Sequence, residues 1–526
     1  MLAQSKPVTC QGCPLELHSS RYLPDSVKAG AAVYVLGEGI DWTTSLPQSP
    51  IGLLSTHLFP LAGLSLVQAS VGNVHRCSPC TLRPVLLSPK ASQQAAAHCE
   101  RTLGGGVGDA QVVVTVGEVA WKHTQHRKDL SVHSWRGHVG PSTYQGKRVY
   151  ATLDPRDITL HANPRMTLPT KMDWAKLPQV IAGTFPKPLP PCLVLGECSL
   201  SVIEKWFGCV REIGTCIAWD TEYLFNRDDP WDANNYKLTM VSITCPEMAH
   251  GVQMLYHGGN ATGQEKHAFI ELFKEIVSLK KSIFHNAKAE AHSTWKTWGW
   301  PIEETLRDFE DTMLAHAARW SEFPHAMDFL ESMYSPYEKI KHLSTNDPKR
   351  NWGDTCITLE IWKALEKELR QDPDSERVYR EQSLKLVLPT LRRDMEGIRV
   401  NQAKVLPLLA KYNTHVEEGV AMAHSAIGWP INLNSPSQLK MWMKLQGVTL
   451  KKGKKSKSET LNKDAVAELR QSILPYDPDF ERDEGVTIPY LISRIEQGAD
   501  AVLEARAFVT RIDKLAGVFL RPLVVK

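Results

Sequence analysis

Hydrophobic positions follow different spacings along the chain, and the changes in spacing divide it into three regions. Up to about residue 185, short apolar runs such as AAVYVLGEGI (31–40) and KRVYATLD (147–154) alternate with helical stretches. This alternation is typical of an α/β layered fold. The proline-rich stretch GTFPKPLPPC (183–192) predicts a linker at the end of this first region, 1–185.

The second region, 190–370, contains predicted strands and amphipathic helices in turn. CIAWDTEYL (216–224) and KLTMVSITC (237–245) predict neighbouring strands, KHAFIELFKEIVSLKK (266–281) a helix, and KSIFHNA (281–287) a further strand. TCITLEIWKALEKELR (355–370) predicts a long closing helix. The third region, 375–526, is more charged and has the periodicity of packed helices, so the fold class is α/β with a mainly helical C-terminal part.

The composition is that of a soluble, multidomain protein. The 526 residues are 42% hydrophobic and 23% charged, and carry a net charge of +3. This charge permits nucleic-acid binding only through a local basic footprint. Neither an apolar run of about 18 residues nor a signal peptide is evident, so we expect no membrane partner. The 11 cysteines then predict thiols or metal ligands in a reducing cytoplasm.

Two acidic residues, Asp220 and Glu222, follow an apolar run and stand two positions apart. On a strand they point to the same side, where like charges repel unless a cation lies between them. Alone, such a pair is most often an acidic strand end in solvent. Glu290 after a predicted strand and Asp354 at a predicted helix start complete a set of four. Hard oxygen ligands suit Mg²⁺ or Mn²⁺, and two such ions about 4 Å apart can cleave phosphodiesters.

Four stretches in the second region, AWDTEYL, FHNAKAEAHSTWKTWGWPI, FEDTMLAHAARW and NWGDTCITLEIW, resemble in order the DnaQ-like 3′–5′ exonuclease domain of family A DNA polymerases. The resemblance implies an RNase H-like fold in which Asp220 and Glu222 bind both metal ions and Asp354 is the last ligand. Glu290 stands where the family usually has aspartate. Asn286 would help to form the second motif and contact DNA, and Asp311 matches a position with a structural role.

Two departures from the family pattern bear on activity. Glu290 is one methylene longer than aspartate. Arg350 stands four residues before Asp354, where the family has a tyrosine that orients the attacking water. Arginine stays protonated and cannot accept a proton, so it would hold a phosphate instead. The alternatives are a slow nuclease and a degenerate domain that only binds a DNA end.

In the third region, LRRDMEGIRVN and INLNSPSQLKMWMKLQG resemble the start of the polymerase region of family A DNA polymerases, where the thumb begins. A lysine-rich run predicts contacts with the phosphates of primer-template DNA, and a solvated charge run is the alternative. These candidates are Lys451, Lys452, Lys454, Lys455 and Lys457. The family's palm and finger motifs do not follow, so we expect a separately encoded palm and fingers subunit, or a truncated product.

Cysteines in the first region lie in a setting, VYVLGEGI, VGNVHRC and ATLDPRD, that resembles family 4 uracil-DNA glycosylases. That family holds a 4Fe–4S cluster. The matching ligands are Cys10, Cys13, Cys77 and Cys99, with Cys80 as a spare. Thiolates suit such a cluster, and Zn²⁺ is the competing metal.

The glycosylase's catalytic positions are altered. DWTT replaces the proline-glycine and acidic residue after GEGI, Asp154 replaces the histidine, and Ile51 stands at the base-stacking position, whereas Asn73 matches. A DNA-binding or uracil-sensing module is therefore expected. The whole resembles phage DNA polymerases with such an N-terminal domain. Three hypotheses follow: a proofreading 3′–5′ exonuclease of a phage-type family A polymerase, a repair glycosylase with an accessory nuclease, and a non-catalytic DNA-clamping subunit.

Overall fold

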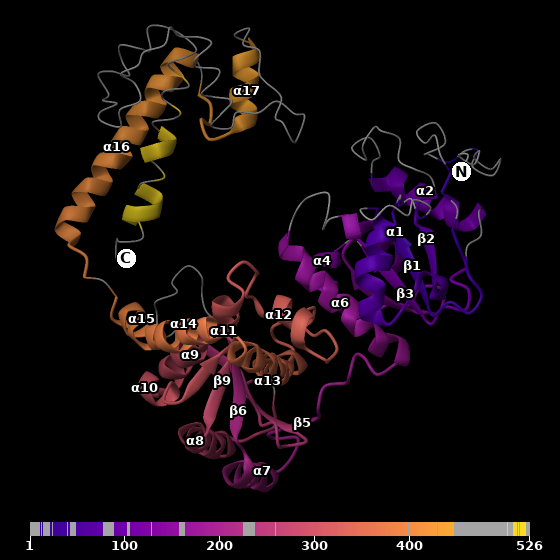
Figure 1. The fold of residues 1–526 in the computed structure, drawn as a ribbon. Coiled ribbons are helices and arrows are strands. Elements are labelled where there is room, and N and C mark those ends of the chain that lie inside the picture. The colour runs from indigo at the N-terminus through magenta and orange to yellow at the C-terminus, as the bar shows by residue number, and fades with distance from the viewer. Residues whose placement is uncertain are drawn as a thin grey trace. The chain divides into compact units, whose positions relative to one another are not determined.

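The computed structural model separates into two compact units, 1–395 and 396–526 (Figure 1). Its described residues are 25–38, 49–76, 89–102, 106–127, 129–156, 164–224, 237–257, 259–397, 399–428 and 430–445, and the positions 11, 13, 22, 23, 40, 42, 502, 506, 509–512, 514 and 516–521.

A four-stranded parallel sheet organises the first region of the chain. Its strands are β1 (Val33–Gly37), β2 (Ala69–Asn73), β3 (Val112–Val116) and β4 (Arg148–Thr152), in the order β2-β1-β3-β4. Every residue of β1, β2 and β3 is buried, and this explains the nearly continuous apolar sequences of β1 and β3. The α/β class expected from the sequence is confirmed here.

A six-stranded mixed sheet organises the second region. Its strands are β5 (Cys192–Val194), β6 (Cys216–Leu224), β7 (Lys237–Thr244), β8 (Gly251–Leu255), β9 (Lys281–Phe284) and β10 (Phe309–Asp311). Their order is β10-β9-β6-β7-β8-β5. Strand β6 pairs antiparallel with β7 and parallel with β9, as expected for its central position. The predicted strands at 216–224, 237–245 and 281–287 are therefore confirmed.

Helices cover both faces of this sheet, and alternate residues of β6 pack on opposite sides. Ile217 and Trp219 join the core formed with α7 (Leu200–Ile213) and α8 (Gly263–Leu279). Ala218 joins the core formed with α13 (Pro348–Arg370). Because side chains alternate along a strand, Asp220 and Glu222 lie on the same side as Ala218, toward α13.

The segment between the two sheets is packed against the second region. Lys187 accepts a backbone hydrogen bond from Glu338 at 3.1 Å and donates one to Pro336 at 2.9 Å. Phe185 is buried. The predicted linker is thus a fixed connector. Buried Arg136 adds a contact, because its Nη2 donates to the Ser332 hydroxyl at 2.8 Å.

The remaining helices surround these sheets or form the second unit. They are α1 (Pro50–Leu53), α2 (Pro89–Thr102), α3 (Glu118–Gln125), α4 (Val132–Trp135), α6 (Pro164–Ala182), α9 (Ala287–Trp298), α10 (Ile302–Thr305), α11 (Thr312–Arg319), α12 (Met327–Tyr334), α14 (Pro373–Val378), α15 (Leu384–Glu396), α16 (Gln402–Ile427) and α17 (Pro436–Leu445). In the second unit, α16 and α17 share an apolar core that includes Ile427, Leu439 and Trp442. Across the described residues, we find no helix long and apolar enough to cross a membrane.

Candidate metal centre

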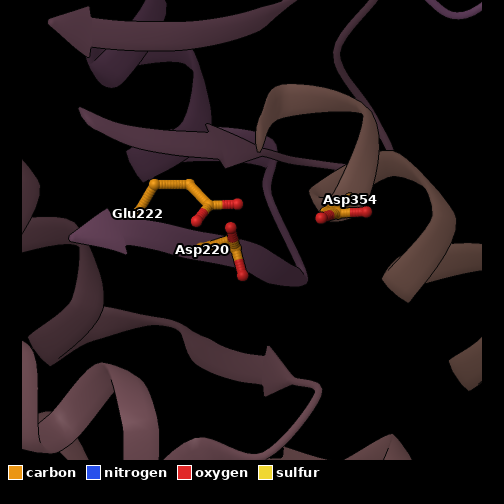
Figure 2. Close-up of side chains that lie close together, drawn as sticks. All are labelled: Asp220, Glu222 and Asp354. Atoms are coloured by element: carbon orange, nitrogen blue, oxygen red, sulfur yellow. The ribbon is translucent and has the colours of Figure 1, made fainter. Parts of the chain in front are cut away.

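Three carboxylates meet between strand β6 and helix α13. Asp220 and Glu222 project from the strand, and Asp354 faces them from the helix (Figure 2). One ligand oxygen from each lies within 4.8 Å of the other two, and this is the sole such group of three among the described residues. A divalent cation needs oxygen ligands from separate segments at this spacing, so the group can hold one.

Helix α13 positions Asp354 in its second turn. The helix begins with Pro348 after the N-cap Asp347, whose side chain accepts from the Lys349 backbone N–H at 2.9 Å. Proline suits this first position because its missing N–H would have no partner within the helix. The buried face of α13 then packs against β6 and β7, which brings Asp354 to the acidic pair.

Burial and mutual repulsion disfavour the charged forms of these acids. Burial, followed by the charges of Asp354 and Glu222, raises the pKa of Asp220 well above its usual range. Burial and then Asp354 raise the pKa of Glu222 to about 7. The pKa of Asp354 is also raised, chiefly by burial. A bound cation would remove this penalty.

Glu290 lies beside this group without belonging to it. It stands in the first turn of α9 and is buried, and it is not one of the three carboxylates within 4.8 Å of one another. Burial, and next the charge of Asp220, raises its pKa well above the usual range. Among the described residues, the Glu290 Oε2 and Asp354 Oδ1 atoms are buried without a hydrogen-bond partner. Unsatisfied buried oxygens of this kind are suited to bind an ion.

Lys341 brings a positive charge into the site that sequence reasoning did not anticipate. Its Nζ lies 2.5 Å from the Asp354 Oδ2. The lysine side chain is 16% exposed and that of Asp354 is 4% exposed. Lys341 belongs to the segment between α12 and α13, and no local pattern marks it as a site residue.

Arg350 lies one turn before Asp354 on α13. Its Nη1 donates to the Leu343 carbonyl at 2.8 Å. Its charge acts to lower the pKa of both Glu222 and Asp354. The guanidinium therefore acts on the carboxylate group, whereas its role toward a substrate stays a prediction.

Asn351 orients Asp220 and was also missed by sequence reasoning. Its Nδ2 donates to the Asp220 Oδ2 at 2.7 Å. The amide oxygen accepts from Gln253 at 3.2 Å and from the Ser242 hydroxyl. These partners fix the orientation of the amide, since its oxygen faces donors and its nitrogen faces the carboxylate. In the sequence, only its position three residues before Asp354 could have marked Asn351 as a site residue.

Asp311 fastens the start of α9 to α11. Its carboxylate caps α11 by accepting from the Met313 and Leu314 backbone N–H groups, at 2.9 and 3.1 Å. It also accepts from the Ala287 N–H at 2.8 Å. Asn286 precedes this point in the left-handed conformation, with φ of 76°. These contacts give Asp311 a structural role, and DNA contact by Asn286 stays a prediction.

In the first region, the glycosylase-like positions make contacts within the protein. The Asn73 amide donates to the Ile40 carbonyl at 3.0 Å and accepts from the Ile40 N–H at 2.9 Å. Asp154 forms an ion pair with Arg156 at 2.6 Å. A cavity that Asn73 lines has a volume of about 10 Å³. This is room for about one water molecule.

Several predicted residues lie outside the part of the chain that the structure describes: Cys10, Cys77, Lys451, Lys452, Lys454, Lys455 and Lys457. Cys13 is partly buried, and Cys99 is buried on α2. Ile51 lies on α1 and is partly buried. The cysteine site and the lysine contacts accordingly remain predictions.

Comparison with known proteins found no matching family model and no matching curated protein. Among solved structures, the chain is similar to the POL domain of Pol1 from M. smegmatis in complex with DNA primer-template and dNTP, at 17% identity and a TM-score of 0.42. The match covers 64% of this chain and 51% of that chain, so it spans about half the length of the solved structure. A likeness of this strength carries no conclusion about family or activity.

Proposed function

We propose that this chain is a 3′–5′ exonuclease that hydrolyses single-stranded DNA from its 3′ end in a reaction that needs Mg²⁺ or Mn²⁺. The observation that carries the proposal is the meeting of Asp220, Glu222 and Asp354 within 4.8 Å. The order of the sequence motifs, which resembles DnaQ-like exonucleases, points to the same chemistry.

The residues present fit a divalent cation. All donors are hard carboxylate oxygens, and the partnerless oxygens of Glu290 and Asp354 lie in the same buried region. Asp220 would hold the ion together with Glu222 and Asp354. When bound, the ion supplies charge stabilisation at the phosphate and an activated water.

The chain's own side chains would act on the ligands and on the DNA phosphate. Asn351 holds Asp220 in one orientation through its 2.7 Å hydrogen bond. Arg350 and Lys341 provide positive charge at the edge of the carboxylates, which favours binding of the negatively charged scissile phosphate. Arg350 cannot accept a hydrogen bond or a proton from the attacking water as a tyrosine hydroxyl oxygen could, so we expect slow hydrolysis.

For the first region we propose DNA binding without glycosylase activity. Two observations support the absence of glycosylase activity: the Asn73 amide is engaged with Ile40, and the Asp154 carboxylate, which is paired with Arg156, is itself an anion and cannot stabilise a uracil anion. Incubation with uracil-containing single-stranded DNA should therefore yield no abasic sites.

The nuclease proposal is tested with a 5′-labelled, 3′-tailed oligonucleotide on a denaturing gel. We expect stepwise shortening from the 3′ end in Mg²⁺ or Mn²⁺, and none in EDTA. Asp220→Ala should abolish it by removing a shared ligand. Asp328→Asn, at an exposed position on α12, is the matched control and should shorten DNA at the wild-type rate. If neither metal supports shortening, the nuclease proposal is wrong, and the alternative is a degenerate domain that only binds a DNA end.

A further inference from the structure

Lys341 contacts the carboxylate site directly and is held in place by the surrounding structure. Its Nζ contacts Asp354 at 2.5 Å, and its charge acts on Asp220 and Glu222 as well, where it opposes the rise in pKa that burial causes in all three acids. The ammonium group therefore faces the whole carboxylate group, and it lies where a metal ion bound to Asp354 would compete with it.

The protein holds the backbone before Lys341 in place through buried contacts. Glu331, which is fully buried, accepts from the Ile340 N–H at 3.0 Å and from the Lys339 ammonium at 3.2 Å. The Ile340 side chain packs so closely on Gly353 that a Cβ there would lie 2.6 Å from the Ile340 Cδ1. Because Gly353 precedes Asp354, this packing brings the two partners of the ion pair together.

Among the four predicted acids and the two cations that act on them, the charges balance with a single divalent ion. Asp311, whose charge also acts on Glu290, is left out of this count because backbone N–H groups of its own neighbours hold its carboxylate. Asp220, Glu222, Glu290 and Asp354 together carry four negative charges when ionised. Lys341 and Arg350 supply two positive charges, which leaves two for a metal. Buried His285 adds none, because burial and the charge of Lys341 lower its pKa to about 3. In the absence of DNA, a second divalent ion would add two positive charges beyond this balance at short range in a poorly solvated site, which is unfavourable.

We propose that Lys341 takes the place of one of the two divalent ions, so that the site binds one Mg²⁺ or Mn²⁺ per chain. The inference rests on the proposed function and refines it. The single ion would be held by Asp220, Glu222 and the partnerless Oδ1 of Asp354. The Lys341 ammonium would pair with the other Asp354 oxygen, Oδ2, and donate to a phosphate oxygen of the DNA end.

The test is the number of Mn²⁺ ions bound per full-length chain, measured by the electron paramagnetic resonance signal of free Mn²⁺ during titration. Sites that disappear in Asp220→Asn are counted as belonging to the carboxylate centre. We expect one such ion for the wild type and two for Lys341→Met, which keeps the length of the side chain and removes its charge. Lys341→Gln serves if the methionine variant does not fold.

Lys349→Met is the matched control, because Lys349 is 46% exposed nearby on α13 and pairs with Glu338. It should bind one ion, like the wild type. Two Asp220-dependent ions in the wild type would overturn the inference and leave the nuclease proposal intact. One ion in both Lys341 variants would also overturn it. No Asp220-dependent Mn²⁺ in any protein would defeat the metal-dependent nuclease proposal as well.

Discussion

The side-chain amide of Asn351 donates a 2.7 Å hydrogen bond to the Asp220 carboxylate, across a sequence separation of 131 residues. Asn351 lies on α13, three residues before Asp354, and Asp220 lies on β6. One helical turn therefore supplies both an acid of the site and the group that orients its neighbour. This arrangement couples the packing of α13 on the sheet to the geometry of the carboxylates.

Replacement of Asn351 with leucine should reduce nuclease activity by roughly 10- to 100-fold, because residues that orient metal ligands commonly have effects of that size. The substitution would leave Asp220 without this donor, whereas the Gln253 amide would lose one acceptor and keep the Pro348 carbonyl. Initial rates at saturating Mn²⁺ measure the effect. Asn346→Ala, at an exposed position just before α13, should keep the wild-type rate. Equal rates for both variants would contradict a positioning role.

Replacement of Arg350 with tyrosine should raise the rate of DNA shortening by about tenfold or more, since a correctly placed proton acceptor contributes roughly 10²- to 10⁴-fold in general base catalysis. Single-turnover rates on the 3′-tailed oligonucleotide measure this change. Arg350→Phe is the matched control, because it supplies the ring without the hydroxyl. A rise in the phenylalanine variant as well would show that loss of the arginine, and not gain of the hydroxyl, is responsible.

Glu222 should make the stability of the EDTA-treated protein depend on pH. The pKa rises from 4.5 in its usual state to about 7 in the folded protein, chiefly because of burial. The folded state then binds more protons than the unfolded state between these values, so the free energy of unfolding falls as the pH rises from about 4.5 to about 7. Thermal unfolding across this range measures the fall.

Glu222→Gln removes one titrating group and should make that fall less steep, while the other acids with raised pKa values, Asp220, Glu290 and Asp354, keep part of it. Addition of Mn²⁺ to the wild type at pH 7 should raise the unfolding temperature, because a ligand that binds only the folded state stabilises it. A wild-type profile that rises with pH over the same interval would be the opposite of what the raised pKa predicts.

The cysteine site predicted at Cys10, Cys13, Cys77 and Cys99 can be tested by colour. Purified protein should be brown, with charge-transfer absorbance that Cys13→Ser removes, because thiolates ligate the iron of a 4Fe–4S cluster. Cys209→Ser, at an exposed cysteine of α7, should keep the colour. Colourless protein containing Zn²⁺ would support the structural alternative, and metal-free protein would refute the site.

Local pattern alone predicted the elements that carry the acids. The apolar run before Asp220 predicted β6, and the period of two along a strand placed Asp220 and Glu222 on one side. The long helix over 355–370 followed from its periodicity, with Asp354 placed at its start. The structure begins this helix seven residues earlier, at Pro348, so that Asp354 lies in its second turn. These features depend on neighbours in the sequence, which is why they could be predicted.

Only the tertiary structure decided which other groups reach the acids. Lys341 lies in the segment that connects α12 and α13, and Asn351 lies on α13. Lysine and asparagine are common at such positions, so neither residue marks a site in the sequence. Their contacts arise because α13 packs on β6 and because Ile340 packs against Gly353. Glu290 was predicted with the other acids, yet the first turn of α9 leaves it beside the group of three. Distances between segments far apart in sequence depend on how helices pack on a sheet, and no local spacing encodes that packing.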